Sequence, residues 1–129
     1  MGRYYDENFK KPEDIQFHHF SRVPNDTKSL SNNDVHWIIA TRQKELYLAT
    51  FGGGLNKLIS ISEDGHGEFK SYSVLDGLSS DVLLSIREDH KQNLWISTEN
   101  GICKYQFPGT FQRGGLYADI RWGYVVWNQ

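Results

Sequence analysis

The sequence predicts an all-β protein built from two copies of one small antiparallel sheet. Aromatic residues make up 14% of the 129 residues and there are 12 glycines. This composition is typical of short strands joined by tight turns. No segment repeats apolar residues at the spacing of an amphipathic helix. In addition, two stretches of the chain are similar to each other at a constant separation of 48 residues.

This internal repeat is the strongest of the signals. Ser29–Ile38 corresponds to Gly77–Ile86, and Leu46–Thr50 corresponds to Leu94–Thr98. After these segments the separation shortens by one residue, so that Leu55 and Lys57 match Ile102 and Lys104. A period of about 40 to 50 residues with four strand-like segments is the spacing of propeller blades. We therefore predict two consecutive four-stranded antiparallel blades of a β-propeller.

The first blade is predicted over residues 35–73. Its strands are expected at Val35–Ala40, Glu45–Thr50, Leu55–Ser60 and Glu68–Ser73. Gly52-Gly53-Gly54 separates the second and third strands, and Glu63–Gly67 separates the third and fourth. Glycine tolerates the positive φ angles that tight turns between paired strands require.

The second blade is predicted over residues 74–112. Its strands are expected at Asp81–Glu88, Asn93–Thr98, Ile102–Gln106 and Thr110–Gln112. Leu94-Trp95-Ile96 is a short continuous apolar run, which suits a strand that is covered on both faces. Asn100-Gly101 provides the turn that follows it.

The remaining segments are assigned by their relation to these blades. Residues 1–16 are expected to form a poorly ordered leader, and residues 17–34 the outer strand of a preceding blade with its connecting loop. Residues 113–129 are either the divergent start of a third blade or a frayed tail. Propellers close into rings of about four to eight blades. We therefore expect an incomplete fragment of a larger ring, with the remaining blades as partners and self-association when isolated.

Composition argues against several functions. The net charge of −2 with interspersed signs does not favour binding of nucleic acid or of a membrane surface. The single cysteine, Cys103, excludes an internal disulfide. The five histidines lack the spacing of a zinc site, so we expect neither a metal nor a cofactor. The N-terminus has no signal peptide, and no segment approaches the roughly 20 apolar residues of a membrane span.

The repeat motifs resemble a known family. Asp76–Val82, Asn93–Thr98 and Asn100–Ile102 resemble the two-component regulator propeller repeat, as do Ser29–Asn33, Leu46–Thr50 and Gly52–Lys57. The resemblance extends over residues 17–106. It departs from the family's pattern at Thr41, where the second unit has Asp89, and at Tyr47, which replaces a tryptophan.

This resemblance implies a function. Such repeats form the periplasmic sensor region of bacterial hybrid sensor histidine kinases, many of which detect oligosaccharides. We therefore expect a periplasmic, ligand-sensing, signal-transducing role through the parent protein and no enzyme activity in this chain. Two other classes remain open. One is a propeller enzyme that acts on polysaccharides, and the other is a protein-interaction propeller scaffold.

The residues expected to bind a ligand lie in loops of the two blades. The loops before the first strand and after the second strand of each blade should emerge at the same rim. Short polar side chains beside an aromatic ring suit the hydroxyl groups of a sugar. The alternative is that they serve turn geometry. The predicted residues are Asn32, Asn33, Phe51, Asp76, Ser79, Ser80, Glu99 and Asn100.

A second set of residues is expected to pack between blades. Tyr47 and Trp95 occupy equivalent positions in the two units, which favours packing over ligand contact. The aliphatic members of the set are Leu46, Leu94, Ile38 and Ile86.

Overall fold

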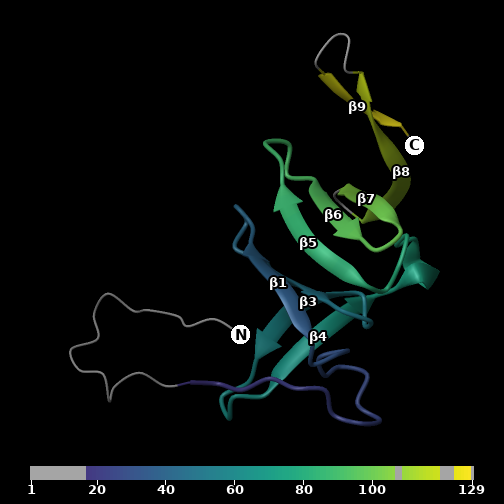
Figure 1. The fold of residues 1–129 in the computed structure, drawn as a ribbon. Helices are drawn as coiled ribbons and strands as arrows, with labels where there is room; N and C mark the ends of the chain where they lie inside the picture. Colours follow the sequence, from purple (N-terminus) through teal and green to yellow (C-terminus); the bar gives the residue numbers. More distant parts are fainter. Residues whose placement is uncertain (1–16, 107–108, 120–123, 129) are drawn as a thin grey trace.

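The computed structural model describes residues 17–106, 109–119 and 124–128, and their fold is all-β (Figure 1). Two antiparallel sheets follow each other along the chain, and the helical content of these residues is one 3-10 turn, Val74–Asp76. The predicted pair of four-stranded blades is confirmed. The leader predicted over residues 1–16 lies outside the described residues.

Blade 1 is a meander of four strands in the order β1-β2-β3-β4. Its strands are β1 (Val35–Ala40), β2 (Leu46–Thr50), β3 (Leu55–Ile61) and β4 (Gly67–Tyr72). Each strand begins and ends within one residue of its predicted bound. Turn chemistry set these bounds, because glycines at positive φ, such as Gly52, Gly54 and Gly65, end the strands where the sequence indicates.

Blade 2 repeats this arrangement with β5 (Leu83–Glu88), β6 (Leu94–Thr98), β7 (Gly101–Gln106) and β8 (Thr110–Asp119). The last strand differs from the prediction. β8 pairs with β7 as far as Gly114, continues to Asp119, and pairs there with β9 (Tyr124–Asn128). Residues 113–119 therefore extend the second blade instead of starting a third one. Gly114 and Gly115 have no side chains to show a strand pattern, but their backbones still form one.

Residues 17–34 form no strand, and the outer strand predicted among them stays a prediction, because its partner strands would belong to a preceding blade. A strand needs a row of backbone hydrogen bonds to a neighbour. Among the described residues, this segment is held on β4 by one such bond, from Phe69 N to Lys28 O at 2.7 Å. Side chains provide the rest of the attachment. Phe20 meets Phe69 edge-on with ring centroids 5.6 Å apart, and Leu30 is buried.

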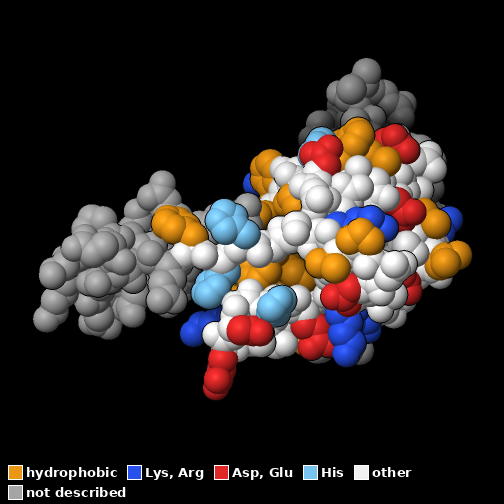
Figure 2. Space-filling model, turned by 90° about the horizontal axis from the view of Figure 1, so that it is seen from below, with side chains coloured by type: hydrophobic (Ala, Val, Ile, Leu, Met, Phe, Trp, Pro, Cys, Tyr) orange, Lys and Arg blue, Asp and Glu red, His pale blue; other side chains and the backbone are white. Residues whose placement is uncertain are grey.

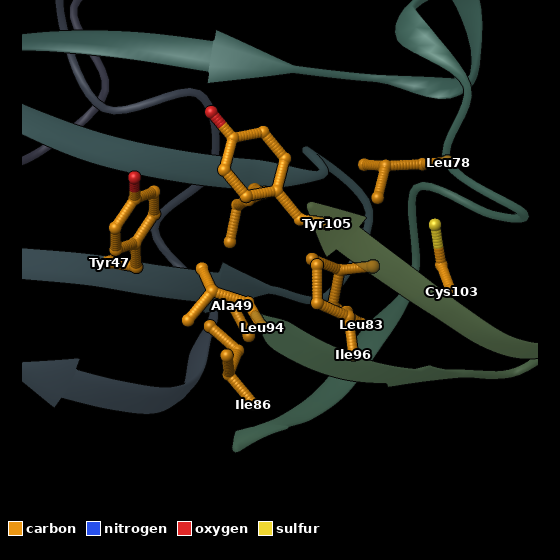
Figure 3. Close-up of a cluster of buried hydrophobic side chains, with 10 residues drawn as sticks. Tyr47, Ala49, Leu78, Leu83, Ile86, Leu94, Ile96, Cys103 and Tyr105 are labelled. Carbon is orange, nitrogen blue, oxygen red and sulfur yellow. The ribbon is translucent and has the colours of Figure 1, made fainter. Parts of the chain in front are cut away.

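The main core lies between the two blades (Figure 3). Blade 1 contributes Tyr47, Ala49 and Leu55 from one face of β2 and β3. Blade 2 contributes the opposing face, and Leu78 comes from the segment between the blades. The blade 2 members are Leu83, Ile86, Leu94, Ile96, Cys103 and Tyr105. Burial of this shared apolar surface is the main force that holds the blades together.

A smaller core lies on the other face of blade 1. Most of its residues are the equivalents of those that blade 2 contributes to the main core. The smaller core contains Leu30, Leu48 and Phe69, with Val35, Ile38 and Leu46 packed against them. Leu30, Val35, Ile38, Leu46 and Leu48 lie 48 residues before Leu78, Leu83, Ile86, Leu94 and Ile96 of the main core. The later set is buried, whereas three members of the earlier set are only half-buried. Blade 2 thus receives from blade 1 a covering layer that blade 1 lacks on its own equivalent face.

The first strand of each blade contains a β-bulge at the same place. In β1 the register shifts between Val35 and Trp37, so that His36 is an extra residue. In β5 it shifts between Leu83 and Ser85, so that Leu84 is extra. Both extra residues are exposed. A bulge bends its strand and redirects a side chain, which here turns His36 and Leu84 to the surface.

Candidate ligand-binding rim

The candidate site is a rim, where a turn of blade 1 meets the chain that enters blade 2. We define the rim as the β2–β3 turn (Phe51–Gly54), the segment that leads into β5 (Ser79–Val82) and the β6–β7 turn (Glu99-Asn100). Phe51 forms a β-bridge with Val82, and the amides of Gly52 and Gly54 both donate to Asp81 O, at 3.0 and 2.9 Å. The rim therefore ties one blade to the next through its backbone.

Both blades build their half of the rim with the same hydrogen bonds. Phe51 N donates to Asp34 O at 2.8 Å, and Glu99 N donates to Val82 O at 3.1 Å, in equivalent positions. Within each turn the hydroxyl of a threonine closes the loop. Thr50 Oγ1 donates to Gly54 O at 2.8 Å and Thr98 Oγ1 to Gly101 O at 2.9 Å. Turn geometry therefore explains these threonines.

An exposed aromatic pair marks the blade 1 side of the rim. Phe51 is 42% exposed, and its ring stacks on the imidazole of His36 with centroids 4.6 Å apart and planes 24° apart. The Nε2 atom of His36 lies 3.4 Å from the carboxylate of Asp34. The bulge in β1 brings His36 to this position, and a bulge leaves no visible signal in a single sequence. Our sequence prediction therefore included Phe51 but missed His36.

Four predicted residues come together on the blade 2 side of the rim. The hydroxyl of Ser79 lies 3.1 Å from that of Thr98, and Asn100 Nδ2 donates to Ser79 O at 3.2 Å. Ser80 Oγ accepts from Val82 N at 3.0 Å and lies 3.4 Å from a carboxylate oxygen of Glu99. The carboxylate of Glu99 remains at the surface, where it is available to accept hydrogen bonds.

The other three predicted residues shape the backbone. Asn32 Oδ1 accepts from Asp34 N at 2.7 Å, and Asn33 Oδ1 accepts from Arg22 N at 2.6 Å. Asp76 completes a capping box, in which its carboxylate accepts from Ser73 N at 2.8 Å. These contacts fit the turn-geometry alternative. Asp76 belongs to the 3-10 turn and not to the rim.

The residues predicted to pack between blades lie on different surfaces. Tyr47, Leu94 and Ile86 belong to the main core, whereas Leu46 and Ile38 pack against the smaller one. Burial, followed by the hydrogen bond from Tyr47 to Glu45, raises the pKa of the Tyr47 phenol.

Trp95 is half-buried and projects from the opposite face of β6 to Leu94. Its Nε1 donates to the carboxylate of Asp89 at 2.8 Å, and the ammonium of Lys104 lies 5.4 Å from its ring. Lys57 and Tyr47 form the equivalent pair in blade 1, at 5.8 Å.

Other kinds of site find no support in the described part of the chain. No group of three or more histidine, cysteine and acidic side chains there is placed to hold a metal ion. No helix described there has the length and apolar character needed to span a bilayer. On the face drawn in Figure 2, acidic and basic side chains are interspersed instead of forming a stripe of one sign.

The two sheets, their 48-residue equivalence and their shared core define consecutive blades of a β-propeller. Residues 77–100 match the family model described as two component regulator propeller. The match covers β5, β6 and the blade 2 residues of the rim, Ser79–Val82 and Glu99-Asn100, so the resemblance drawn from the sequence is confirmed for this repeat. No curated protein matches the chain.

Proposed function

We propose that this chain is a non-catalytic, ligand-sensing part of the propeller of a two-component sensor, and that it binds an oligosaccharide at the rim. The family match at residues 77–100 supports a place in such a sensor. The parent would be a hybrid histidine kinase with this region in the periplasm, and further blades would be the partners of the two described here.

The exposed stack of Phe51 on His36 is the observation that carries this proposal. The ring of Phe51 is 42% exposed at a turn, so its apolar surface stays in unfavourable contact with water. The ring offers a flat face of the kind on which sugar rings pack. The carboxylate of Asp34 lies beside His36, and Glu99 and Asn100 are exposed on the blade 2 side of the same rim. These groups can accept from, or donate to, the hydroxyls of a sugar.

The same geometry offers a route for the signal. The amides of Gly52 and Gly54 donate two hydrogen bonds to Asp81 O, at the junction between the blades. A ligand that binds Phe51, the residue before Gly52, therefore acts directly beside this junction. Binding that favours one angle between the blades would shift the population of states in the parent protein.

A glycan array tests the proposal. The 129-residue chain and its Phe51→Ala variant are compared on neutral and acidic oligosaccharides. We expect specific binding that the variant weakens by about two- to tenfold, because ring stacking contributes roughly 0.5–1.5 kcal/mol. Phe17→Ala is the control, because it removes a ring that is 60% exposed on the N-terminal segment. Uniform silence of the wild-type chain, or equal binding by the Phe51 variant, would reject the rim as a sugar site.

A further inference from the structure

A second feature lies between the inner strands β1 and β5, below the rim. A shallow groove of about 400 Å³ runs between these strands. Its lining residues are Trp37, Ile38, Ile39, Ala40, Ile86, Arg87 and Glu88. Both blades therefore contribute to the groove, and β1 connects it to the rim through the consecutive residues His36 and Trp37.

The groove presents one aromatic ring and one cation. Trp37 is 39% exposed, and the guanidinium carbon of Arg87 lies 5.9 Å from the centroid of its ring. Within the described residues, Arg87 forms no ion pair with an acidic side chain. The adjacent Glu88 is directed elsewhere, because its Oε1 accepts from Arg42 N at 3.1 Å. The guanidinium group of Arg87 is thus available to pair with an acidic group of a ligand.

Comparison of equivalent residues in the two repeats shows which groove positions the two blades do not share. Val35 and Ile38 of β1 have aliphatic equivalents in β5, Leu83 and Ile86. The other groove positions differ between the repeats, since Trp37, Ile39 and Ala40 correspond to Ser85, Arg87 and Glu88. Core packing therefore fixes the first set and Ile39, whereas Trp37 and Arg87 are exposed and free to vary with a ligand.

We infer that the groove binds a carboxylate-bearing sugar unit of an acidic oligosaccharide, which deepens the proposed function and rests on it. The guanidinium of Arg87 matches a planar carboxylate with two parallel hydrogen bonds, a geometry that an ammonium group cannot reproduce. The exposed part of the Trp37 indole packs against the sugar ring. The rim then holds the neighbouring sugar unit of the same ligand.

The test uses an array in which each uronic-acid oligosaccharide is paired with its methyl ester. The ester keeps the ring and its hydroxyls but removes the charge. We expect the wild-type chain to prefer the acids, and Arg87→Gln to lose that preference by about tenfold or more, because charge-assisted hydrogen bonds are worth roughly 1.5–3 kcal/mol. Arg87→Lys keeps the charge without the fork and should restore only part of the preference.

Arg22→Gln is the matched control, because Arg22 is an exposed arginine on the N-terminal segment and the substitution changes the net charge equally. It should bind as the wild type does. Circular dichroism and thermal unfolding of Arg87→Gln should match the wild type, because the side chain is exposed. Equal binding of acids and esters, or unchanged binding by Arg87→Gln, would overturn this inference and leave the rim proposal standing. Absence of binding to every glycan would reject both.

Discussion

Asp89 shows how one side chain organises a turn in blade 2. Its Oδ1 accepts from Lys91 N at 2.8 Å and Asn93 N at 3.0 Å, and its Oδ2 accepts from Trp95 Nε1 at 2.8 Å. Burial opposes ionisation of Asp89, but these hydrogen bonds outweigh it and lower the pKa of the carboxyl group. Thr41 occupies the equivalent turn in blade 1 and accepts one of these bonds, from Glu45 N at 3.1 Å.

We predict that Asp89→Ala lowers the free energy of unfolding by about 1–3 kcal/mol at neutral pH, because several donors lose their acceptor. Thr41→Ala, which removes one of the equivalent bonds, should cost less. Urea denaturation followed by tryptophan fluorescence measures both. Equal losses for the two variants would contradict the prediction.

The same carboxylate makes stability depend on pH. Because the folded pKa of Asp89 lies below its unfolded value of about 3.9, its contribution is fully present above that value and is lost as pH falls through the folded pKa. The difference in stability between wild type and Asp89→Asn should therefore shrink below about pH 4. Denaturation curves measured from neutral pH to pH 3 would show whether it does.

Asn56 and Cys103 hold equivalent positions in the two blades and are both fully buried. Asn56 has its own partner, since Oδ1 accepts from Ser31 N at 3.1 Å and Nδ2 donates to Ser31 Oγ at 2.6 Å. Cys103 makes a weak contact from Sγ to Gly77 O at 3.8 Å, and burial raises the pKa of its thiol. The two repeats thus attach the incoming loop to the blade by different chemistry.

We predict that Asn56→Ala destabilises the chain by about 2–3 kcal/mol, because Ser31 N loses its acceptor and Ser31 Oγ loses a donor, keeping its bond to Gly53 O. Cys103→Ala should cost only about 1 kcal/mol, since it removes one small group from an apolar site. Chemical denaturation under reducing conditions compares the two. A larger loss for the cysteine variant would show that the loop contact of Asn56 contributes little.

Turns are the elements that fix the bounds of each blade. Gly54 has φ +77, and a Cβ added there would collide with the carbonyl oxygen of Tyr72. Gly101 is its counterpart in blade 2, with φ +93, but an added Cβ would have its nearest neighbour 3.8 Å away, at Gly114 O. The two positions share the need for positive φ and differ in available space.

We predict that Gly54→Ala lowers the free energy of unfolding by about 3 kcal/mol or more, because backbone strain adds to a backbone collision. Gly101→Ala should cost only about 1–2 kcal/mol of conformational strain. Thermal and urea unfolding of both variants would measure the difference, and similar costs would show that β4 moves away freely.

The strands of the repeat were predictable because two copies reported the same pattern. Leu46–Thr50 and Leu94–Thr98 carry matched apolar residues, and glycine-rich turns bound them. The bulges at His36 and Leu84 were not predictable, because a bulge changes pairing without changing composition. For this reason the sequence indicated Phe51 at the rim but neither its stacking partner nor the groove beside Trp37.

At the scale of the whole molecule, the two blades share one core, and the chain outside the repeat packs by other means. Residues 17–34 lie on blade 1 without forming a strand, and β8 continues into a pairing with β9. Neither arrangement has a copy elsewhere in the sequence to reveal it. The predicted strand bounds therefore hold inside the repeat, whereas residues 17–34 and 113–119 lie outside the pattern that the two copies share.

We predict that Ile86→Ala destabilises both blades together, by about 2–5 kcal/mol, because Ile86 lies in the core that they share. Hydrogen exchange should rise in the strands of blade 1 as well as in those of blade 2. Leu48→Ala is the comparison, because Leu48 is equally buried but lies in the smaller core. It should raise exchange mainly in blade 1. Unchanged exchange in β2 and β3 of Ile86→Ala would contradict a shared core.

The extra residue in the first strand of each blade has a consequence for how a propeller of such blades diversifies. His36 and Leu84 take no part in the cross-strand register, so the pairing on either side of them does not depend on their identity. A mutation at either position changes what the inner surface displays and leaves the sheet beneath it intact. The first strand of each blade thus carries one interchangeable position, and a ring of such blades could change its exposed surface one residue at a time.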